Sequence, residues 1–402
     1  MMQSADSEKL MVRGMWAVLL AQFLSAFADN ALLFTAIALL KNSHAPDWYE
    51  PMLQEFFAFA FILLAPFVGP AADAYPKGRV MLWANAAKLL GALMMLSGTH
   101  PLLAYGVVGL GAAAYSPAKY GILSELVGPQ ALVKANSLLE GSTIVAILLG
   151  AVSGGMLADA SVAMGLSVVA GCYFLAGLVN LGIPKLPPAH AVASFQVKVL
   201  ARDFWIALKT LYGNHDARFS LLGTSLFWGI GSTLRFLLVA WVPVALAITD
   251  NGTPANLNGA VAVGIALGAG FAAKWVSLET VNRALGAGLA LGVLVMVFAH
   301  TTTLPLTVVL LIAIGACGGF YVVPLNALLQ ERGHETVGSG HAIAVQNFSE
   351  NTAMLLLVGM YTLLVRSGAS VLAISSAFGV AILLGMGMLT VGRMLRQRAR
   401  PA

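Results

Sequence analysis

Two stretches of this chain resemble one another at a separation of about 205 residues. They read GAAAYSPAKYGILSEL at residues 111–126 and GACGGFYVVPLNALLQER at residues 315–332. Each carries one proline inside an apolar run, Pro117 in the first and Pro324 in the second, where it would loosen a helix. A repeat of this kind predicts a chain built from two similar halves.

The composition around this repeat is that of a protein surrounded by lipid. Hydrophobic residues make up 59% of the 402 residues and charged residues only 10%, and the mean hydropathy is +0.86. These values exclude an ordinary soluble domain. Cys172 and Cys317 lie in apolar runs, and the sequence has neither zinc-ligand spacing nor a Gly-Lys-Ser/Thr phosphate loop. We therefore expect no metal and no cofactor.

Apolar runs of about 20 residues, long enough to cross a hydrocarbon core of about 30 Å, occur twelve times. They start near residues 14, 52, 78, 101, 134, 162, 217, 257, 281, 304, 338 and 370. The closely joined runs near 134 and 162 are the hardest to divide. The sequence thus predicts an all-α integral membrane protein of twelve transmembrane helices in two pseudo-symmetric six-helix halves, residues 1–183 and 217–402.

Residues 184–216 form the longest polar stretch inside the chain. The stretch begins with three prolines and becomes amphipathic around Phe204 and Trp205. This composition is typical of a linker that lies along the membrane surface.

The basic residues predict the orientation, because Lys and Arg near span ends favour the cytoplasm. With the N-terminus inside, 17 of the 22 Lys and Arg residues fall in cytoplasmic segments, two fall outside and three lie within spans. Both termini are then cytoplasmic. The net charge of +5 reflects this topology rather than a nucleic-acid site. We expect the basic tail from Arg393 onward to anchor at anionic headgroups.

Five charged residues lie inside runs that are otherwise apolar: Asp29, Lys119, Glu140, Arg235 and Glu350. A charge at the centre of a span costs about 2.5–3.5 kcal/mol on insertion scales, so such residues usually face a polar interior and serve transport. The pattern indicates a membrane transporter.

The repeat places Asp29 of span one opposite Arg235 of span seven. Asn30 lies beside the first, and Trp228 lies on the same helical stripe as the second. We expect Asp29 and Arg235 to pair across a central cavity and to separate during transport. A permanent salt bridge between the helices is the alternative.

Span eleven presents two polar faces to its surroundings. Gln346 and Glu350 share one face, and Asn347 and Asn351 share the next. Such a set of side chains could bind a polar headgroup or a cation, or could simply hold helices together, although measured gains of the second kind average only about 0.6 kcal/mol.

Lys119 lies near Tyr115 in the inner half of span four, where it could hold a phosphate. Pairing with Glu140 is an equally good interpretation, and the two are compatible. We expect the side chain of Lys88 to snorkel to the membrane surface or to form a hydrogen bond with a neighbouring backbone group. We do not expect it to bind a substrate.

The loop after span two reads GPAADAYPKGR at residues 69–79. Its glycine, aspartate and basic cluster resemble the signature of the major facilitator superfamily, although the spacing from Asp73 to Gly78 is longer than usual. Asp73, Lys77 and Arg79 are expected to form a gate or hinge at the cytoplasmic face.

Several longer motifs are similar to those of the bacterial lysophospholipid transporter family, a branch of the same superfamily. They are AQFLSAFADNALLF from Ala21, the residue 111–126 stretch, GTSLFWGIGSTLRFLLVAWVPVAL from Gly223, VVPLNALLQERG from Val322 and AIAVQNFSEN from Ala342. The resemblance covers essentially the whole chain. It carries the charged set of the family over to Asp29, Lys119 and Arg235.

This resemblance implies that the protein moves lysophosphatidylethanolamine and lysophosphatidylglycerol from the outer to the inner leaflet of a bacterial inner membrane. Reacylation by a cytoplasmic-face acyltransferase/acyl carrier protein synthetase, a possible partner, would follow. Our hypothesis for the mechanism is that the headgroup enters laterally between helices and crosses by alternating access of the two halves. Energy coupling to a proton or Na⁺ stays open.

Two alternatives remain from the sequence. One is a major facilitator for another amphipathic solute or a drug, which would share the fold and the central charges. The other is a membrane acyltransferase or lipase, but neither a His-x4-Asp motif nor a Gly-x-Ser-x-Gly elbow occurs. We therefore do not expect an enzyme.

Overall fold

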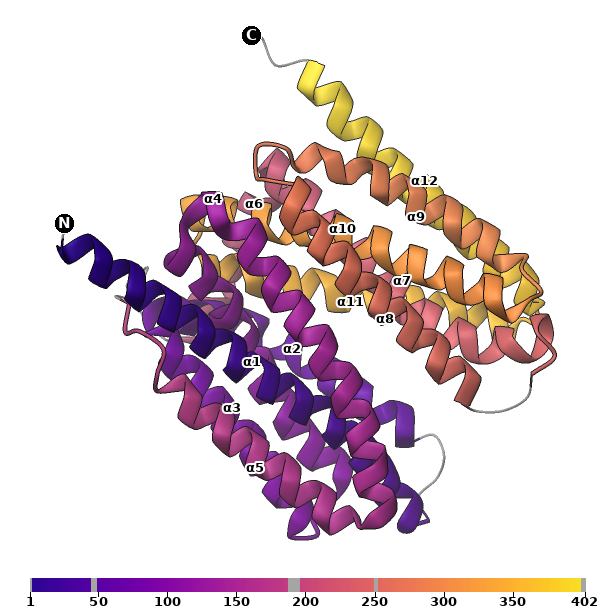
Figure 1. Ribbon diagram of the computed structural model, residues 1–402, viewed down its shortest axis with the longest axis horizontal. Helices are drawn as coiled ribbons and strands as arrows, with labels where there is room; N and C mark the ends of the chain where they lie inside the picture. The colour runs from indigo at the N-terminus through magenta and orange to yellow at the C-terminus, as the bar shows by residue number, and fades with distance from the viewer. Residues whose placement is uncertain (1, 45–48, 187–195, 249–251, 399–402) are drawn as a thin grey trace. The chain divides into compact units, whose positions relative to one another are not determined.

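The structure is a computed structural model that describes residues 2–44, 49–186, 196–248 and 252–398. Every regular element in this described part is a helix (Figure 1). The elements are α1 (Met2–Asn42), α2 (Tyr49–Ala74), α3 (Lys77–Leu96), α4 (Pro101–Ala160), α5 (Val162–Asn180), α6 (Val197–Gly213), α7 (His215–Ala245), α8 (Gly252–Trp275), the 3-10 turn η1 (Val281–Arg283), α9 (Ala284–Ala299), α10 (Leu304–Thr336), α11 (Ser339–Arg366) and α12 (Val371–Arg398).

Eleven helices in the described residues are long and apolar enough to cross a membrane. One of them, α4, has 60 residues, which at 1.5 Å per residue is about 90 Å, three times the thickness of a hydrocarbon core. At Gly128 the backbone leaves the helical conformation, with φ 67° and ψ 174°, and Pro129 follows. Glycine suits that turn because a side chain disfavours positive φ. Counted as two spans, α4 brings the total to the twelve that the sequence predicts.

The break between the spans that start near 134 and 162 is clear. Ser161 is extended (φ −168°) and its hydroxyl accepts from the N–H of Met164 at 3.4 Å, so it ends α4 and caps α5. The ambiguous junction is the Gly128 turn, where two spans follow one another almost without a loop.

Contacts among the described residues group the chain into two compact units. Unit 1 contains residues 1–135, 142–211 and 330–348, and unit 2 contains residues 136–141, 212–329 and 349–402. The start of α11 therefore packs with helices of the N-terminal half, and a short piece of α4 packs with helices of the C-terminal half.

Close helix packing in each unit depends on small residues. In unit 1, a side chain at Gly154 would lie 2.6 Å from the carbonyl oxygen of Ala31, so only glycine lets α4 approach α1 so closely. In unit 2, Gly264 and Gly268 of α8 meet the backbone of α10 in the same way. The apolar side chains on the other faces are exposed, for example Met156 at 69% and Met388 at 70%, as expected of surfaces covered by lipid.

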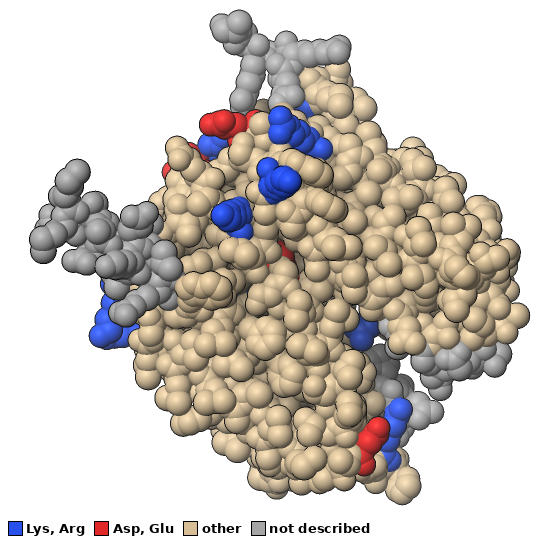
Figure 2. All heavy atoms as spheres, viewed as in Figure 1, with Lys and Arg blue, Asp and Glu red and all other residues tan. Residues whose placement is uncertain are grey.

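Charged side chains are sparse on the face of the molecule that Figure 2 shows, where most of the described surface is uncharged.

Of the predicted linker, residues 187–195 lie outside the described part. The amphipathic helix that follows is α6, whose Phe204 is buried against Phe348 with ring centres 5.4 Å apart. Trp205 on its other face is 53% exposed.

Candidate functional site

The centre of unit 1 holds a buried ammonium group. Lys88 of α3 is 2% exposed, and its Nζ lies 2.7 Å from Oδ2 of Asp29 on α1 and 2.9 Å from Oγ of Ser25. Burying an ion costs several kcal/mol unless an opposite charge and hydrogen bonds compensate it. The carboxylate of Asp29 therefore compensates the cost of burying the ammonium of Lys88.

Further hydrogen bonds complete this group, which we name the Lys88 cluster (Ser25, Asp29, Asn85, Lys88 and Tyr173). The hydroxyl of Tyr173 on α5 donates to Oδ1 of Asp29 at 2.7 Å, and Ser25 donates to Oδ1 of Asn85 at 2.9 Å. The side chain of Asp29 keeps 21% of its surface exposed while Lys88 is shielded. Asp29 is thus the member of the cluster that a ligand can still reach.

The sequence-based interpretation of Lys88 is wrong. We expected a snorkelling side chain or a bond to the backbone, and the structure gives an ion pair with Asp29 in the interior. Hydropathy could not reveal the pair, because the two residues lie on different helices, 59 positions apart. Asp29 belongs to unit 1 and Arg235 to unit 2, so their pairing stays a prediction.

A second polar group lies at the end of α2 and joins it to the start of α11. Oδ1 of Asp73 accepts from the backbone N–H of Gly340 at 2.7 Å. Oδ2 of Asp73 accepts from the backbone N–H of His341 at 3.1 Å and lies 2.8 Å from Nδ1 of the same histidine. A carboxylate at a helix N-terminus is stabilised by the free N–H groups and by the helix dipole.

Lys77 extends this group towards α4. Its Nζ lies 2.6 Å from Oε1 of Glu125 and 3.7 Å from Oδ1 of Asp73. We name Asp73, Lys77, Glu125, Gly340 and His341 the Asp73 cluster. Sequence reasoning identified the first two but missed the others as partners; backbone N–H donors such as that of Gly340 leave no signal in the sequence.

Arg79, the third residue of the predicted gate, lies apart from this cluster. Its side chain is exposed and lines a cavity with the segment that follows α5. The structure therefore brings together two of the three expected gate residues.

Other predicted residues of unit 1 are buried or half-buried. Lys119 is 8% exposed, with its Nζ 4.1 Å from the ring centre of Tyr120. Tyr115 is buried, and its ring centre lies 5.0 Å from Nζ of Lys88. Oδ1 of Asn347 accepts from Ser116 at 3.3 Å, Asn30 donates to the carbonyl of Ala26 at 2.9 Å, and Gln346 is buried.

Predicted residues of unit 2 also lie within its helices. Oε1 of Glu140 accepts from Nδ2 of Asn326 at 3.4 Å, and both residues are buried. Glu350 and Asn351 are each 8% exposed, Trp228 is half-buried, and Arg235 is exposed on α7. Asn326, from the second copy of the repeat, is a partner that the sequence did not indicate.

Arg393 has a role other than the expected one. Its guanidinium forms an ion pair with Asp216 in the first turn of α7, donates to Oδ1 of Asn282 at 3.1 Å and lies 4.9 Å from the ring centre of Phe219. The side chain is 15% exposed, so the expected contact with lipid headgroups is wrong for this residue, and for the rest of the basic tail it stays a prediction. No group of three or more metal-binding side chains occurs in the described part of the chain.

Comparison with known families identifies the architecture. The sequence profile described as Major Facilitator Superfamily matches residues 18–358. The chain belongs to the Major Facilitator Superfamily.

Two bacterial members with high similarity are each described as "Lysophospholipid transporter LplT". That of Yersinia enterocolitica serotype O:8 / biotype 1B is 55% identical over 374 residues, 93% of both chains. That of Yersinia pestis (strain Pestoides F) is 55% identical over 365 residues, 91% of this chain and 90% of its own.

Solved structures of other major facilitators share the fold. The human organic anion transporter MFSD10 (TETRAN) superposes with a TM-score of 0.77 at 16% identity, covering 94% of this chain and 99% of its own. FucP in the outward conformation gives a TM-score of 0.73 at 13% identity, with the same coverage. At these identities the likeness establishes the fold alone.

Proposed function

We propose that this major facilitator transports lysophospholipids across a bacterial inner membrane. The observation that carries the proposal is the 55% identity, over 93% of both chains, to a lysophospholipid transporter of Yersinia. The substrates would be lysophosphatidylethanolamine and lysophosphatidylglycerol, moved from the outer to the inner leaflet. The product would be reacylated by a cytoplasmic-face acyltransferase/acyl carrier protein synthetase.

The charges within the spans support a phospholipid headgroup as the cargo. Such a headgroup carries a phosphate, which needs a cation, and in the ethanolamine case an amine, which needs an anion. Asp29 can supply the anion, because its carboxylate is partly exposed while its present partner Lys88 is buried. Arg235, exposed on α7, can supply the cation, with Lys119 as a second candidate.

Transport then requires partner exchange at Asp29. The ammonium of a substrate would compete with Lys88 and Tyr173 for the two carboxylate oxygens, and pairing of Asp29 with Arg235 would form the alternate state. Other polar, acidic and aromatic residues would line the path. We assign this lining to Asn30, Tyr115, Glu140, Trp228, Gln346, Asn347, Glu350 and Asn351.

The Asp73 cluster is suited to act as the inner gate. Three hydrogen-bond donors of α11 and the ammonium of Lys77 meet one carboxylate, so the gate opens only when all of these contacts separate together. In this scheme, residues 1–183 and 217–402 rock about the linker 184–216, and both termini are cytoplasmic.

The test is uptake of labelled lysophosphatidylethanolamine into spheroplasts that contain the wild type, Asp29→Asn or Arg235→Ala at equal membrane levels. We expect both variants to lose uptake. Asp159→Asn and Arg202→Ala, which make the same chemical changes at exposed positions, are expected to transport at the wild-type rate.

One outcome would overturn the substrate assignment and another the charged site. If the inserted wild type moves no lysolipid above empty membranes, lysophospholipid is not the substrate. If Asp29→Asn and Arg235→Ala transport at the full rate, the substrate assignment survives but the charged site does not carry it.

A further inference from the structure

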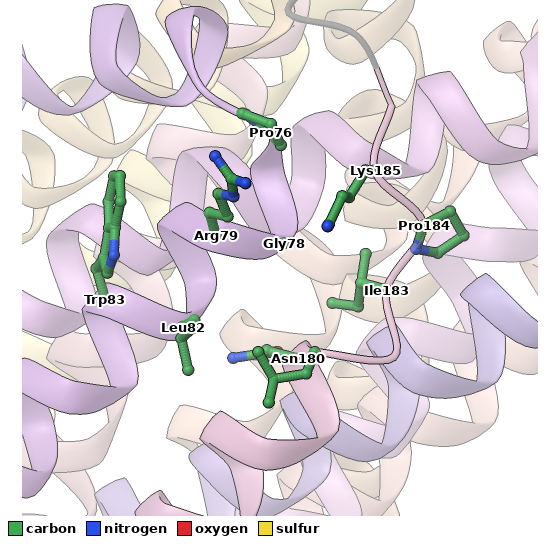
Figure 3. Close-up of a pocket in the computed structure, with 10 residues that line it drawn as sticks. Pro76, Gly78, Arg79, Leu82, Trp83, Asn180, Ile183, Pro184 and Lys185 are labelled. Atoms are coloured by element: carbon green, nitrogen blue, oxygen red, sulfur yellow. The ribbon is translucent and has the colours of Figure 1, made fainter.

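A cavity of about 360 Å³ lies at one end of unit 1, between the first turn of α3 and the segment that follows α5 (Figure 3). Its volume falls in the range of about 300–1,000 Å³ that is usual for ligand sites. On α3 its wall runs from Gly78 to Trp83 and includes no residue of the Lys88 cluster, so the cavity is a separate site. The start of the first span is near: a side chain at Gly14 would lie 2.9 Å from the ring of Pro184.

The cavity has the features of an anion site. Pro76 precedes α3, and no side chain caps the N-terminus of this 20-residue helix, so its first N–H groups and the positive end of its dipole are available. Arg79 projects from α3, and Lys185 projects from the opposite wall towards Gly78 (Figure 3). Among the described residues that line the cavity, none is acidic.

A buried amide supplies an independent indication of a ligand. Asn180, the last residue of α5, lines the cavity and is 2% exposed. Neither its Nδ2 nor its Oδ1 has a hydrogen-bond partner among the described residues. Buried polar groups normally have partners, because an unsatisfied one costs free energy. A phosphate oxygen held by Arg79 and Lys185 would give the amide nitrogen an acceptor.

The rim of the cavity indicates that the ligand comes from the bilayer. Trp83 is 54% exposed and Leu181 65% exposed, and Tyr75 packs edge-on against Trp83 with ring centres 5.3 Å apart. Exposed aromatic side chains beside basic residues are typical of the level of the lipid headgroups. An acyl chain could follow this apolar rim while its headgroup occupies the cavity.

We propose that this cavity binds the phosphate of an anionic diacyl glycerophospholipid of the surrounding leaflet as a resident lipid that is not transported. The site goes beyond the proposed transport function and does not depend on it. A bound lipid would tie α3 to the segment after α5, next to the Asp73 cluster, and would thereby link the lipid composition of the leaflet to that end of the molecule.

Fluorescence quenching by brominated lipids tests the proposal on the purified full chain in phosphatidylcholine bilayers. Bromine on the acyl chains of phosphatidylglycerol quenches the fluorescence of nearby tryptophan side chains. The difference in fluorescence between the wild type and Trp83→Phe is the contribution of Trp83, and its quenching reports lipid at the cavity. We expect Trp83 to be quenched at several-fold lower mole fractions of brominated phosphatidylglycerol than of brominated phosphatidylcholine. The double variant Arg79→Gln/Lys185→Gln is expected to raise the half-quenching mole fraction about tenfold.

The matched control is Arg202→Gln/Lys209→Gln, which removes the same two charges from exposed positions of α6. We expect it to change the half-quenching mole fraction by less than about twofold, since long-range attraction to anionic lipid is spread over many charges. The variant Asn180→Leu is expected to keep the fold and weaken the preference for phosphatidylglycerol.

Several results would overturn the proposal. These are equal quenching of Trp83 in the wild type by both lipids, an unchanged preference in the Arg79→Gln/Lys185→Gln variant, or an equal shift in the control. Loss of the preference on adding millimolar inorganic phosphate would instead indicate a site for free phosphate. The comparison of the two lipids needs only the wild type and Trp83→Phe, so it decides even if the double variant fails to fold.

Discussion

The Lys88 cluster and the Asp73 cluster both compensate a buried charge, but they do so with different kinds of partner. Lys88 and Asp29 are side chains 59 residues apart within the N-terminal half. Asp73 instead accepts from backbone N–H groups of α11, 267 and 268 residues away. A rearrangement of α11 would break the second set of contacts and leave the first intact. A movement of α11 alone can therefore open the Asp73 cluster, whereas the Lys88 cluster changes only when a ligand or another charge exchanges partners at Asp29.

The largest effect is expected from Asp29→Asn, which leaves the ammonium of Lys88 buried without an anion. Breaking a buried pair in this way costs about 3–5 kcal/mol, so we expect a large fall in the free energy of unfolding, measured in mixed micelles with increasing denaturing detergent. The double variant Asp29→Asn/Lys88→Met removes both charges and should recover most of the stability without recovering uptake. A double variant as unstable as Asp29→Asn would mean that the pair is not what stabilises this region.

A smaller effect is expected from Asp73→Asn, which removes the negative charge but keeps the shape of the side chain. Loss of the charge-assisted bonds to the start of α11 should cost about 2–3 kcal/mol. The gate should also open more often. A cysteine introduced at the buried Ser339, with Cys172 and Cys317 replaced by serine, should then react faster with a membrane-impermeant maleimide added on the side that the proposed orientation makes cytoplasmic. Equal labelling with and without Asp73→Asn would show that this carboxylate does not hold the gate.

The ion pair of Arg393 in unit 2 extends the comparison to a site that joins α12 to the start of α7. Arg393→Gln removes a partly buried charged partner of Asp216 and is expected to cost about 1–2 kcal/mol in the same unfolding assay. Uptake should remain close to normal at equal protein levels, because neither residue of the pair belongs to either cluster. Loss of uptake without loss of stability would assign Arg393 to the transport cycle.

The smallest effect is expected at the exposed pair of Arg332 and Glu335, whose Nη1 and Oε2 lie 2.6 Å apart. Exposed pairs contribute little because water and salt screen them, so Arg332→Gln should change the unfolding free energy by less than about 0.5 kcal/mol. This variant serves as the reference for the other three. A cost above about 1 kcal/mol would show that burial is not what separates strong pairs from weak ones here.

The sequence was sufficient to predict the spans, the amphipathic helix α6 and the proximity of Asp73 and Lys77, which lie at the facing ends of α2 and α3. These features depend on hydropathy and on neighbours along the chain. It did not identify Lys88 as the partner of Asp29, nor Asp216 as the partner of Arg393, because those pairs depend on how helices distant in sequence pack. The near absence of a loop at Gly128 was equally hidden, since a glycine followed by a proline normally indicates a longer break between two helices.

The measurement that tests transport most directly uses the purified chain in proteoliposomes whose outer surface is supplied with labelled lysophosphatidylethanolamine. Protection of the label from an external lysophospholipase reports its movement across the bilayer. We expect protection with the wild type and none above protein-free vesicles with Asp29→Asn/Lys88→Met, although that variant folds. Equal protection by the wild type and by protein-free vesicles would contradict lysophospholipid transport, and full protection by the double variant would contradict the role of Asp29.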